Sequence, residues 1–353
     1  MKLLLTTDAV GGAWTFALEL GAQLAAGGHS VTLAVLGPDA PPGRLAELRR
    51  VPGVRVLQHR CALEWMPEPW AEVESSGRWL LEVAARERPD VVHLGGYAHA
   101  ALPFEAPVVV TAHSCVLSWW RAVHGTGAPP QWRRYAAALR EGLQRARLVV
   151  APTGAMLRAL EAEHGRLGAS AVIPNGRRPE LFPPLVKAEL VLCAGRLWDP
   201  AKNLAALEAA ARHCSWPVAC AGPGGSGGAV RPLGELTTIQ LARWLGRAAI
   251  FALPALYEPF GLAVLEAALA GCALVLGDIA SLRELWEDAA VFVDPRRPDL
   301  LAGVLNRLAA APAARSELAG AARRRALELS PQRMAAGYLK AYAGVLSHPY
   351  KAA

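Results

Sequence analysis

Short apolar runs alternate with longer amphipathic segments along the first half of the chain. A run of about four to eight apolar residues followed by apolar positions three and four apart is typical of a β-strand followed by an α-helix. The predicted strands span 2–7, 29–36, 54–59, 91–94, 108–112, 148–151 and 171–173. The predicted helices span 14–26, 71–88, 132–146 and 154–164. Repeated β-α units of this kind predict a parallel sheet covered by helices.

Residues 174–187 interrupt this pattern. They contain four prolines and an Asn-Gly turn without periodicity, which is typical of a linker. The pattern then restarts, with predicted strands at 190–194, 217–221, 249–253, 273–277 and 290–293 and predicted helices at 204–213, 237–246 and 261–270. From residue 299 onward we expect helices, with breaks near Pro312 and Pro331. The chain is therefore predicted to form two Rossmann-like halves, with a ligand in the cleft between them.

Composition agrees with two folded domains. The chain has 353 residues, of which 53% are hydrophobic and 19% charged, and this excludes a disordered protein. The formal net charge is +7, from 37 Lys and Arg against 30 Asp and Glu. This surplus is weaker than a nucleic-acid binder usually carries, so we expect no nucleic-acid partner. It suits an anionic small molecule or the anionic face of a membrane.

The cysteine spacing and the hydropathy of the chain indicate the cellular compartment in which we expect the protein. None of the six cysteines forms a C-x-x-C pair, and a chain of this size needs no disulfides, so we expect a reducing compartment. The first residues carry only a short apolar run, below the roughly 7–15 residues of a secretory signal. The longest apolar stretch, 261–277, contains Glu266 and lacks the ~20 apolar residues of a membrane span. We therefore expect a cytoplasmic protein.

The first candidate binding feature lies between the first strand and the first helix. Gly11 and Gly12 would let the backbone approach a ligand, and a helix N-terminus offers free N–H groups to an anion. The alternative is a plain tight turn. The segment lacks G-x-G-x-x-G, and no acidic residue ends the second strand, which disfavours a nicotinamide cofactor.

The second feature is a pair of cations after the first strand of the second half. Arg196 follows that strand, and Lys202 precedes the next helix. Arginine offers a planar fork to phosphate oxygens and lysine a mobile point charge, a combination that suits a diphosphate. The alternative is two solvated surface cations.

The third feature is the segment 257–267, which contains two glutamates. Glu258 lies in a loop after a strand, and Gly261 leaves backbone N–H groups accessible at a helix start. Glu266 lies two turns into an otherwise apolar helix, where an unpaired charge would be very costly. Ligand hydroxyls are good partners for such carboxylates. The alternative is a loop acid and a lone charge on an exposed stripe.

Together these residues resemble the retaining GT-B glycosyltransferases of family four. The resemblance rests on Glu258 and Glu266 with Pro-Phe-Gly-Leu between them, and on Arg196 with Lys202. Three further segments match in the expected order: Pro174-Asn175-Gly176 followed by Phe182, Gly11-Gly12, and Gly28-His29-Ser30-Val31. The resemblance implies an α/β GT-B fold, in which two Rossmann-like domains face each other across a cleft. It implies an N-terminal acceptor-binding domain (1–177), a donor-binding domain (178–335) and a C-terminal helix (336–353) that packs back on the first domain.

The resemblance also implies roles for single residues. Glu266 would bind the ribose of a nucleotide, and Glu258 would bind hydroxyls of the donor sugar. Arg196 and Lys202 would hold the diphosphate and stabilise it as it leaves. His113, at a strand end, resembles the family histidine that touches the donor sugar, although a buried structural histidine is the alternative.

The remaining implied donor contacts come from both domains. Gly11 and Gly12 would contribute backbone contacts from the first domain, and Asn175 belongs to the Asn-Gly hinge. Phe260, Gly261 and Leu262 surround the helix start whose N–H groups would help Glu258.

The implied reaction transfers a sugar from a nucleoside diphosphate to an acceptor with the anomeric configuration kept. A retaining glycosidase would use one carboxylate as a nucleophile. Here the resemblance assigns both glutamates to binding, and the departing phosphate would take the acceptor proton. We expect no metal and no other cofactor, because two cations serve the diphosphate. The alternatives are a sugar-nucleotide epimerase of the same fold and a non-catalytic nucleotide-sugar-binding subunit.

The acceptor is expected to meet the first domain. Trp119 and Trp120 follow His113 and are the acceptor candidates, because aromatic rings stack on sugars or line an apolar pocket. The alternative is core packing. The acceptor class stays open between a small molecule, a glycan and a lipid-linked molecule, and peripheral contact with the inner face of the membrane stays open with it. The oligomeric state is not predicted.

Two departures from the family pattern stand out. Arg178 occupies the place where the family often has Asp after the Asn-Gly turn. The loop from Gly222 to Arg231 is short and glycine-rich, where relatives usually have a longer helical insert. We expect base recognition to differ there.

Overall fold

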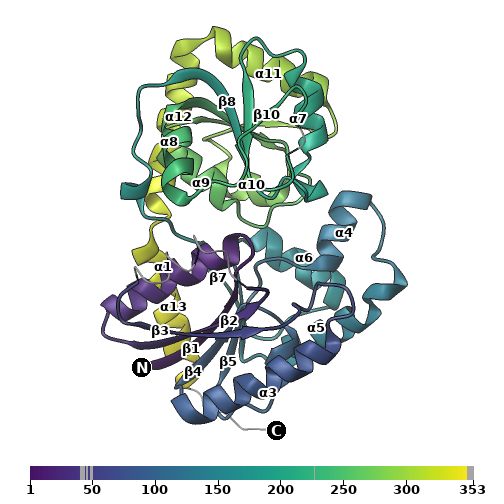
Figure 1. The fold of residues 1–353 in the computed structure, drawn as a ribbon, viewed down its shortest axis with the longest axis vertical. Coiled ribbons are helices and arrows are strands. Elements are labelled where there is room, and N and C mark those ends of the chain that lie inside the picture. Colours follow the sequence, from purple (N-terminus) through teal and green to yellow (C-terminus); the bar gives the residue numbers. More distant parts are fainter. Residues whose placement is uncertain (40–43, 45–46, 48–50, 226, 348–353) are drawn as a thin grey trace. The chain divides into compact units, whose positions relative to one another are not determined.

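The chain divides into two units, each with its own parallel sheet. The computed structural model describes residues 1–39, 44, 47, 51–225 and 227–347. One unit comprises 1–121, 126–176 and the chain from 331 onward, and the other comprises 122–125 and 177–330 (Figure 1). Apart from the short segment 122–125, the chain passes from the first unit to the second at 176/177 and returns at 330/331. These two crossings lie near the predicted domain boundaries at 177/178 and 335/336.

The first unit is built on a seven-stranded sheet. Its strands are β1 (Lys2–Asp8), β2 (Ser30–Gly37), β3 (Val54–Arg60), β4 (Val91–Leu94), β5 (Val108–Thr111), β6 (Leu148–Ala151) and β7 (Ser170–Val172). They are parallel and follow the order β3-β2-β1-β4-β5-β6-β7, so the winding direction reverses between β1 and β4. Leu3, Leu4 and Leu5 are all buried, as expected for a strand whose two faces are both covered.

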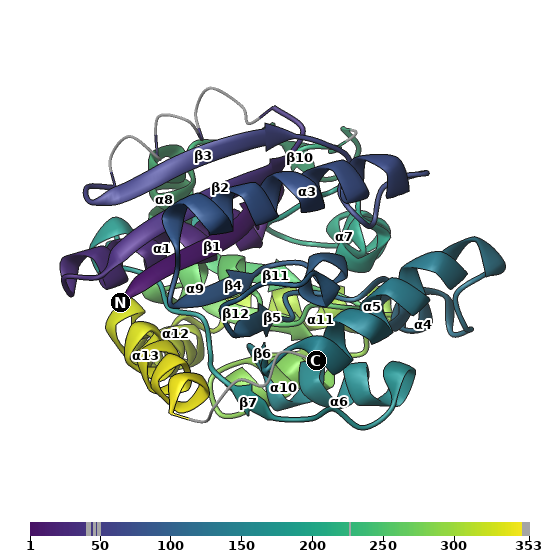
Figure 2. The ribbon, with the colours of Figure 1, turned by 90° about the horizontal axis from the view of Figure 1, so that it is seen from below.

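Helices cover both faces of this sheet. They are α1 (Gly12–Ala26), α3 (Trp70–Glu87), α4 (Val116–His124), α5 (Arg133–Arg145), α6 (Gly154–His164) and α13 (Pro331–Leu346), with short 3-10 turns η1 (Ala98–Ala101) and η2 (Pro130–Trp132). The core on one face joins Trp14 and Leu20 of α1 to Tyr338 and Tyr342 of α13. In Figure 2, α3 runs alongside β1 and β2, and α13 is drawn in yellow below the N-terminus. The last helix is thus part of the core of the first unit.

The second unit is built on a six-stranded sheet. Its strands are β8 (Ala188–Ala194), β9 (Val218–Ala221), β10 (Arg231–Pro232), β11 (Ala248–Leu253), β12 (Ala273–Gly277) and β13 (Val291–Val293), in the order β10-β9-β8-β11-β12-β13. Its helices are α7 (Leu204–Ala211), α8 (Thr238–Arg247), α9 (Leu262–Leu269), α10 (Ala280–Trp286), α11 (Pro298–Ala310) and α12 (Pro312–Glu328), with 3-10 turns η3 (Pro179–Leu181) and η4 (Pro200–Lys202). All described strand pairs are parallel. Both sheets therefore confirm the predicted doubly wound α/β architecture.

Three elements differ from the predictions. Helices α4 and α10 were not predicted from the sequence, and the two-residue strand β10 begins at Arg231, where the predicted loop from Gly222 ends. The helices α4 and α10 have nine and seven residues, too few for a periodic apolar stripe to stand out. Residue 226, within the predicted glycine loop, and residues 348–353, within the predicted last segment, lie outside the described residues.

A buried polar network attaches α13 to the first sheet. The His93 ring, on β4, makes hydrogen bonds through Nδ1 to the Tyr342 hydroxyl at 2.7 Å and through Nε2 to the Thr111 hydroxyl at 2.6 Å. The Thr111 oxygen also lies 2.9 Å from the Tyr338 hydroxyl. Burial, with His113 nearby as a smaller cause, lowers the pKa of His93 to about 3, so the ring is neutral at pH 7.

Tyr342→Phe should destabilise the first unit. The substitution leaves His93 Nδ1 buried without its partner, which costs about 1–3 kcal/mol. Urea unfolding measures the change, and Tyr338→Phe is the matched control on the same helix. Tyr338→Phe should lower the free energy of unfolding by less than Tyr342→Phe, because the Thr111 hydroxyl keeps His93 as a partner. Equal losses for the two variants would contradict the role given to His93.

Acid should destabilise the first unit through His93. The folded state binds the proton more weakly than the unfolded state, so stability falls as the pH drops below the unfolded pKa of about 6.5. Between pH 7 and pH 5 His93 alone should lower the free energy of unfolding by about 2 kcal/mol. His93→Gln should be less stable at pH 7 but should lose about 2 kcal/mol less on acidification. Identical pH dependence in both proteins, measured by urea unfolding, would exclude this cause.

Candidate active site

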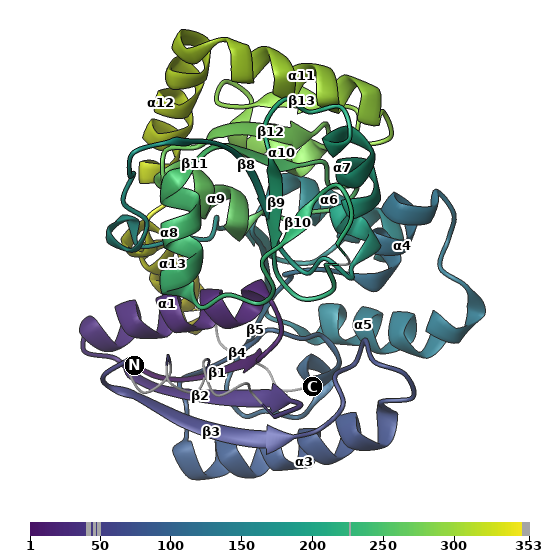
Figure 3. The ribbon, with the colours of Figure 1, turned by 45° about the horizontal axis from the view of Figure 1, so that its top comes forward.

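The strand order of the second sheet brings two loops together. β8 pairs with β9 on one side and with β11 on the other, so the winding direction reverses between β8 and β11 (Figure 3). The loop after β8 (195–203) and the loop after β11 (254–261) leave the same carboxyl edge at this point. Ligands of open α/β sheets bind outside the carboxyl ends of the strands at such a reversal.

Lys202 and Glu258 connect these loops. Lys202 Nζ donates to Glu258 Oε2 at 2.5 Å, and the two side chains are 11% and 16% exposed. The other carboxylate oxygen, Oε1, accepts from the Gly261 N–H at 3.0 Å. The Ser281 hydroxyl on α10 donates to the Glu258 carbonyl at 2.5 Å. Glu258 is therefore fixed on three sides, and the sequence analysis missed the contribution of Ser281.

Arg196 lies in the same loop as Lys202 and is held by Asp199. Arg196 Nη2 lies 3.2 Å from Asp199 Oδ2, while Asp199 Oδ1 accepts from the Ala201 N–H at 3.0 Å and begins η4. The Arg196 Nε atom is buried and has no hydrogen-bond partner among the described residues. A buried N–H group without a partner is stabilised when it donates a hydrogen bond, and an anionic oxygen such as that of a phosphate is a strong partner for it.

The Trp198 side chain, also missed by the sequence analysis, is 53% exposed beside Arg196. The guanidinium carbon of Arg196 lies 5.6 Å from the Trp198 ring centroid. The loop after β9 packs against the Trp198 backbone at Gly224, where a Cβ atom would lie 2.6 Å from the Trp198 nitrogen. This close approach requires glycine at position 224.

The start of α9 lies beside the Glu258 carboxylate. Gly261 precedes the helix in the left-handed region (φ 88°), and a Cβ there would approach the Val264 side chain to 3.0 Å. Phe260 is buried in the core of the second unit, and Leu262 packs against it. The predicted glycine thus permits the turn that brings the Gly261 N–H to Glu258.

Glu266 pairs with an arginine of the same unit. Arg177 Nε donates to Glu266 Oε1 at 2.7 Å, and the side chains are only 7% and 9% exposed. The Arg177 guanidinium carbon lies 5.1 Å from the ring centroid of Phe182, which is fully buried. A partner for Glu266 was expected from the sequence, but Arg177, which lies 89 residues away, was not predicted to be that partner.

The predicted residues of the first unit lie at several places. Gly11 (φ 73°) lies three residues after the end of β1 and directly before α1, and Gly12 begins that helix. Asn175 is buried in the first unit, and its Oδ1 atom has no hydrogen-bond partner among the described residues. Trp119 and Trp120 lie on α4 in an edge-to-face contact with centroids 5.9 Å apart, and both are half-buried.

His113 follows β5 and packs against Phe16 of α1, with ring centroids 4.6 Å apart. Burial lowers the pKa of His113 to about 4, so the ring is neutral at pH 7. A neutral imidazole has one donor and one acceptor nitrogen, which suits hydroxyl groups better than phosphate.

Glu64 is an acidic group that the sequence analysis did not consider. Its carboxylate accepts from the backbone N–H groups of Tyr97 and Ala98, the latter at 2.8 Å, and so caps η1 after β4. Burial raises the pKa of Glu64, and Asp8 at the end of β1 adds to the rise. Asp8 ends β1, and the Glu64 carboxylate contacts the turn that follows β4, and the first sheet reverses between these two strands.

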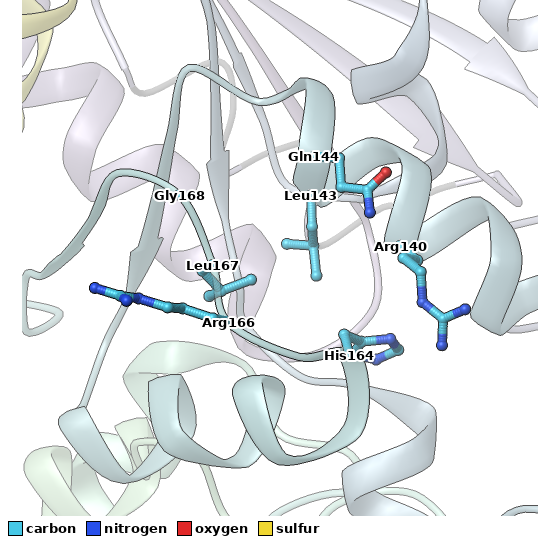
Figure 4. A pocket seen from close by; sticks show the side chains of 7 residues that line it. All are labelled: Arg140, Leu143, Gln144, His164, Arg166, Leu167 and Gly168. Carbon is cyan, nitrogen blue, oxygen red and sulfur yellow. The ribbon is translucent and has the colours of Figure 1, made fainter.

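One small cavity lies in the first unit, away from these residues. It has a volume of about 40 Å³ and is lined by Arg140, Leu143, Gln144, His164, Arg166, Leu167 and Gly168 (Figure 4). In Figure 4 the Arg166 guanidinium lies away from the His164 ring. A volume of this size holds one or two water molecules. None of the predicted site residues lines it.

Within residues 1–39, 44, 47, 51–225 and 227–347, no three or more His, Cys, Asp and Glu side chains gather in a way that would hold a metal ion. No helix in these ranges has the length and apolar character needed to cross a membrane.

Solved structures with the same fold cover nearly the whole chain. Sucrose-phosphate synthase from Thermosynechococcus elongatus has a TM-score of 0.81 at 19% identity and covers 98% of this chain and 99% of its own. Anabaena HepE in complex with UDP-glucose has a TM-score of 0.78 at 17% identity, with 98% and 100% covered. WaaG, a glycosyltransferase involved in lipopolysaccharide biosynthesis, has a TM-score of 0.75 at 14% identity, with 98% and 100% covered. The two doubly wound units are those of a GT-B fold.

Sequence comparison identifies the family. The model of Glycosyltransferase Family 4 matches residues 10–181, and that of Glycosyl transferases group 1 matches residues 225–325. The chain therefore belongs to the glycosyltransferases that these two models, family 4 and group 1, describe. It is also 40% identical over 99 residues to glycogen synthase of Mycobacterium tuberculosis, a match that covers 28% of this chain and 24% of that protein.

The Lys202–Glu258 contact should contribute to the stability of the second unit. Glu258→Gln leaves a mostly buried ammonium group without its carboxylate, and we expect a loss of about 1–3 kcal/mol. The double variant Lys202→Met/Glu258→Gln should recover part of that loss. A double-mutant cycle by urea unfolding should give a coupling of at least about 1 kcal/mol. Strict additivity would show that the two groups do not interact.

Proposed function

We propose that this glycosyltransferase moves a sugar from a nucleoside-diphosphate sugar to a hydroxyl acceptor with the anomeric configuration retained. The observation that carries the proposal is the Lys202–Glu258 contact across the reversal point of the second sheet, with Arg196 in the same loop. Lys202 and Glu258 are held in place by their neighbours at the carboxyl edge of the sheet. A ligand of an open α/β sheet binds at this edge, so it would meet a cation and a carboxylate that are already oriented.

The diphosphate is assigned to Arg196 and Lys202. The guanidinium can form two parallel hydrogen bonds to phosphate oxygens, and the ammonium group adds a mobile charge. An arriving diphosphate competes with Glu258 for Lys202, and the released Glu258 oxygen then accepts from a hydroxyl of the donor sugar. Glu266 is assigned to the ribose, and the N–H groups at Gly261 and Leu262 to the region near the sugar.

The chemical step breaks the bond between the anomeric carbon and the terminal phosphate oxygen. The acceptor oxygen forms the new bond to the anomeric carbon on the same face, and its proton passes to the departing phosphate oxygen. Arg196 and Lys202 stabilise the charge that develops on the leaving diphosphate. No protein nucleophile is required, since both glutamates bind the donor.

Two of the similar proteins indicate which substrates to test first. HepE was solved with UDP-glucose, which makes that donor the first one to test. The partial likeness to glycogen synthase suggests a glucan among the first acceptors. On the first unit, Gly11, Gly12, Asn175 and His113 are assigned to the donor, and Trp119 with Trp120 to the acceptor. All six cysteines are free thiols, in keeping with a reducing, cytoplasmic site of action.

Lys202→Ala should fold normally and lose most transferase activity. Hydrogen bonds to charged groups contribute roughly 1.5–3 kcal/mol, so turnover should fall by about one to two orders of magnitude. The assay follows release of nucleoside diphosphate from UDP-, GDP-, ADP- and dTDP-glucose, with and without a glucan or a simple alkyl glucoside. Arg307→Ala, an exposed arginine on α11, is the matched control and should retain wild-type turnover.

Three results would contradict the proposal. Wild-type turnover in Lys202→Ala would remove the diphosphate assignment. Conversion of a donor to its epimer without an acceptor would indicate an epimerase. Tight donor binding with neither transfer nor hydrolysis across the panel would indicate a binding subunit. Circular dichroism of each variant excludes misfolding as the cause.

A further inference from the structure

The ion pair between Arg177 and Glu266 is buried in a helix that is otherwise apolar. Glu266 is the one charged residue of α9, whose sequence is LAVLEAAL. Its carboxylate oxygen Oε1 lies 2.7 Å from Arg177 Nε, and less than a tenth of either side chain is exposed. Arg177 is the first residue of the second unit after the crossing at 176/177.

Stability alone is a weak reason for such a pair. Taking two charges out of water costs about as much as their attraction returns, and apolar residues of similar volume often serve equally well. Removing one partner, by contrast, leaves an uncompensated buried charge. A pair of this kind in an apolar helix therefore suggests that the carboxylate is used, and that the arginine serves the carboxylate.

Three contacts fix the Arg177 side chain and backbone. Its Nε atom bonds to Glu266, and its guanidinium lies over the Phe182 ring at 5.1 Å. Its backbone N–H donates to the Leu329 carbonyl at 3.1 Å, beside the second crossing at 330/331. A planar guanidinium held in this way keeps the bound carboxylate in one orientation.

We propose that Arg177 is a positioning residue that orients Glu266 toward the ribose hydroxyls, so that the enzyme selects ribonucleoside over deoxyribonucleoside diphosphate sugars. This inference rests on the proposed function, which assigns the ribose to Glu266. An ionised carboxylate in a fixed orientation accepts hydrogen bonds from hydroxyl groups more strongly than a neutral or rotating one. The 2′-hydroxyl is the group that distinguishes the two classes of nucleotide.

The test compares ligands that differ only in the 2′-hydroxyl. Isothermal titration measures the affinity of UDP, ADP and GDP, and then that of the 2′-deoxy counterpart of the nucleotide that binds most tightly. The wild type should prefer the ribonucleotide by about 10-fold to 100-fold. Arg177→Met should reduce that preference to less than about 3-fold, while affinity for inorganic pyrophosphate stays within about 2-fold of the wild type. Arg177→Lys should restore part of the preference.

Matched variants separate positioning from folding. Arg178→Met changes the exposed neighbouring arginine and should keep the wild-type preference. The double variant Arg177→Met/Glu266→Gln removes both buried charges, so it remains measurable if Arg177→Met alone unfolds. Because Arg177 acts through Glu266, the double variant should have the same reduced preference as Glu266→Gln alone.

Three results would overturn the inference. One is a folded Arg177→Met protein that keeps the full preference for the 2′-hydroxyl. Another is a wild type that binds ribo- and deoxyribonucleotides equally well. A wild type that binds pyrophosphate but no nucleotide refutes the ribose assignment and the inference with it. Failure to bind any of these ligands would instead refute the proposed function.

Discussion

The donor site depends on one consequence of sheet topology, the contact between the loop after β8 and the loop after β11. The order β9-β8-β11 makes neighbours of two strands whose following loops lie more than 50 residues apart in sequence, and Lys202 Nζ meets Glu258 Oε2 there at 2.5 Å. Gly261 can supply its N–H to the same carboxylate because it adopts a positive φ. Any ligand at this edge encounters a cation and a carboxylate that are already oriented, so little reorganisation is needed when charge develops.

Two kinds of polar contact with little exposure have different roles in this chain. In the first unit His93 is neutral and is satisfied by Thr111 and Tyr342, which attaches the last helix to the sheet without placing a charge in the core. The second unit contains two ion pairs with little exposure, the buried pair Arg177–Glu266 and the partly buried pair Lys202–Glu258. A neutral network suits a structural attachment, whereas an ion pair retains charge that a phosphate or a hydroxyl can use.

The pattern of apolar and polar residues along the sequence was sufficient to predict most of the helices and strands. It was not sufficient to predict which residues pair with the buried polar and charged side chains. Strands such as β1, with Leu3–Leu5, are continuous apolar runs, and their alternation with helices predicts parallel sheets. The order of the strands, and with it the two reversal points, came from the structure. The helices α4 and α10 were missed because they are short. The Arg177–Glu266 pair was missed because its members lie 89 residues apart, and only the fold brings them together. The Glu64 contact with the start of η1 and the Ser281 bond to Glu258 were missed for the same reason.

Hydrogen–deuterium exchange with and without a saturating nucleoside diphosphate tests the location of the donor site most directly. Bound nucleotide should slow backbone exchange in the segments 195–203 and 257–266, because their loops and the start of α9 would contact the diphosphate and the sugar. The Lys202→Ala protein should show no such protection at the same ligand concentration. Protection confined to the cavity segments 140–144 and 164–168, with 195–203 and 257–266 unchanged, would contradict the account.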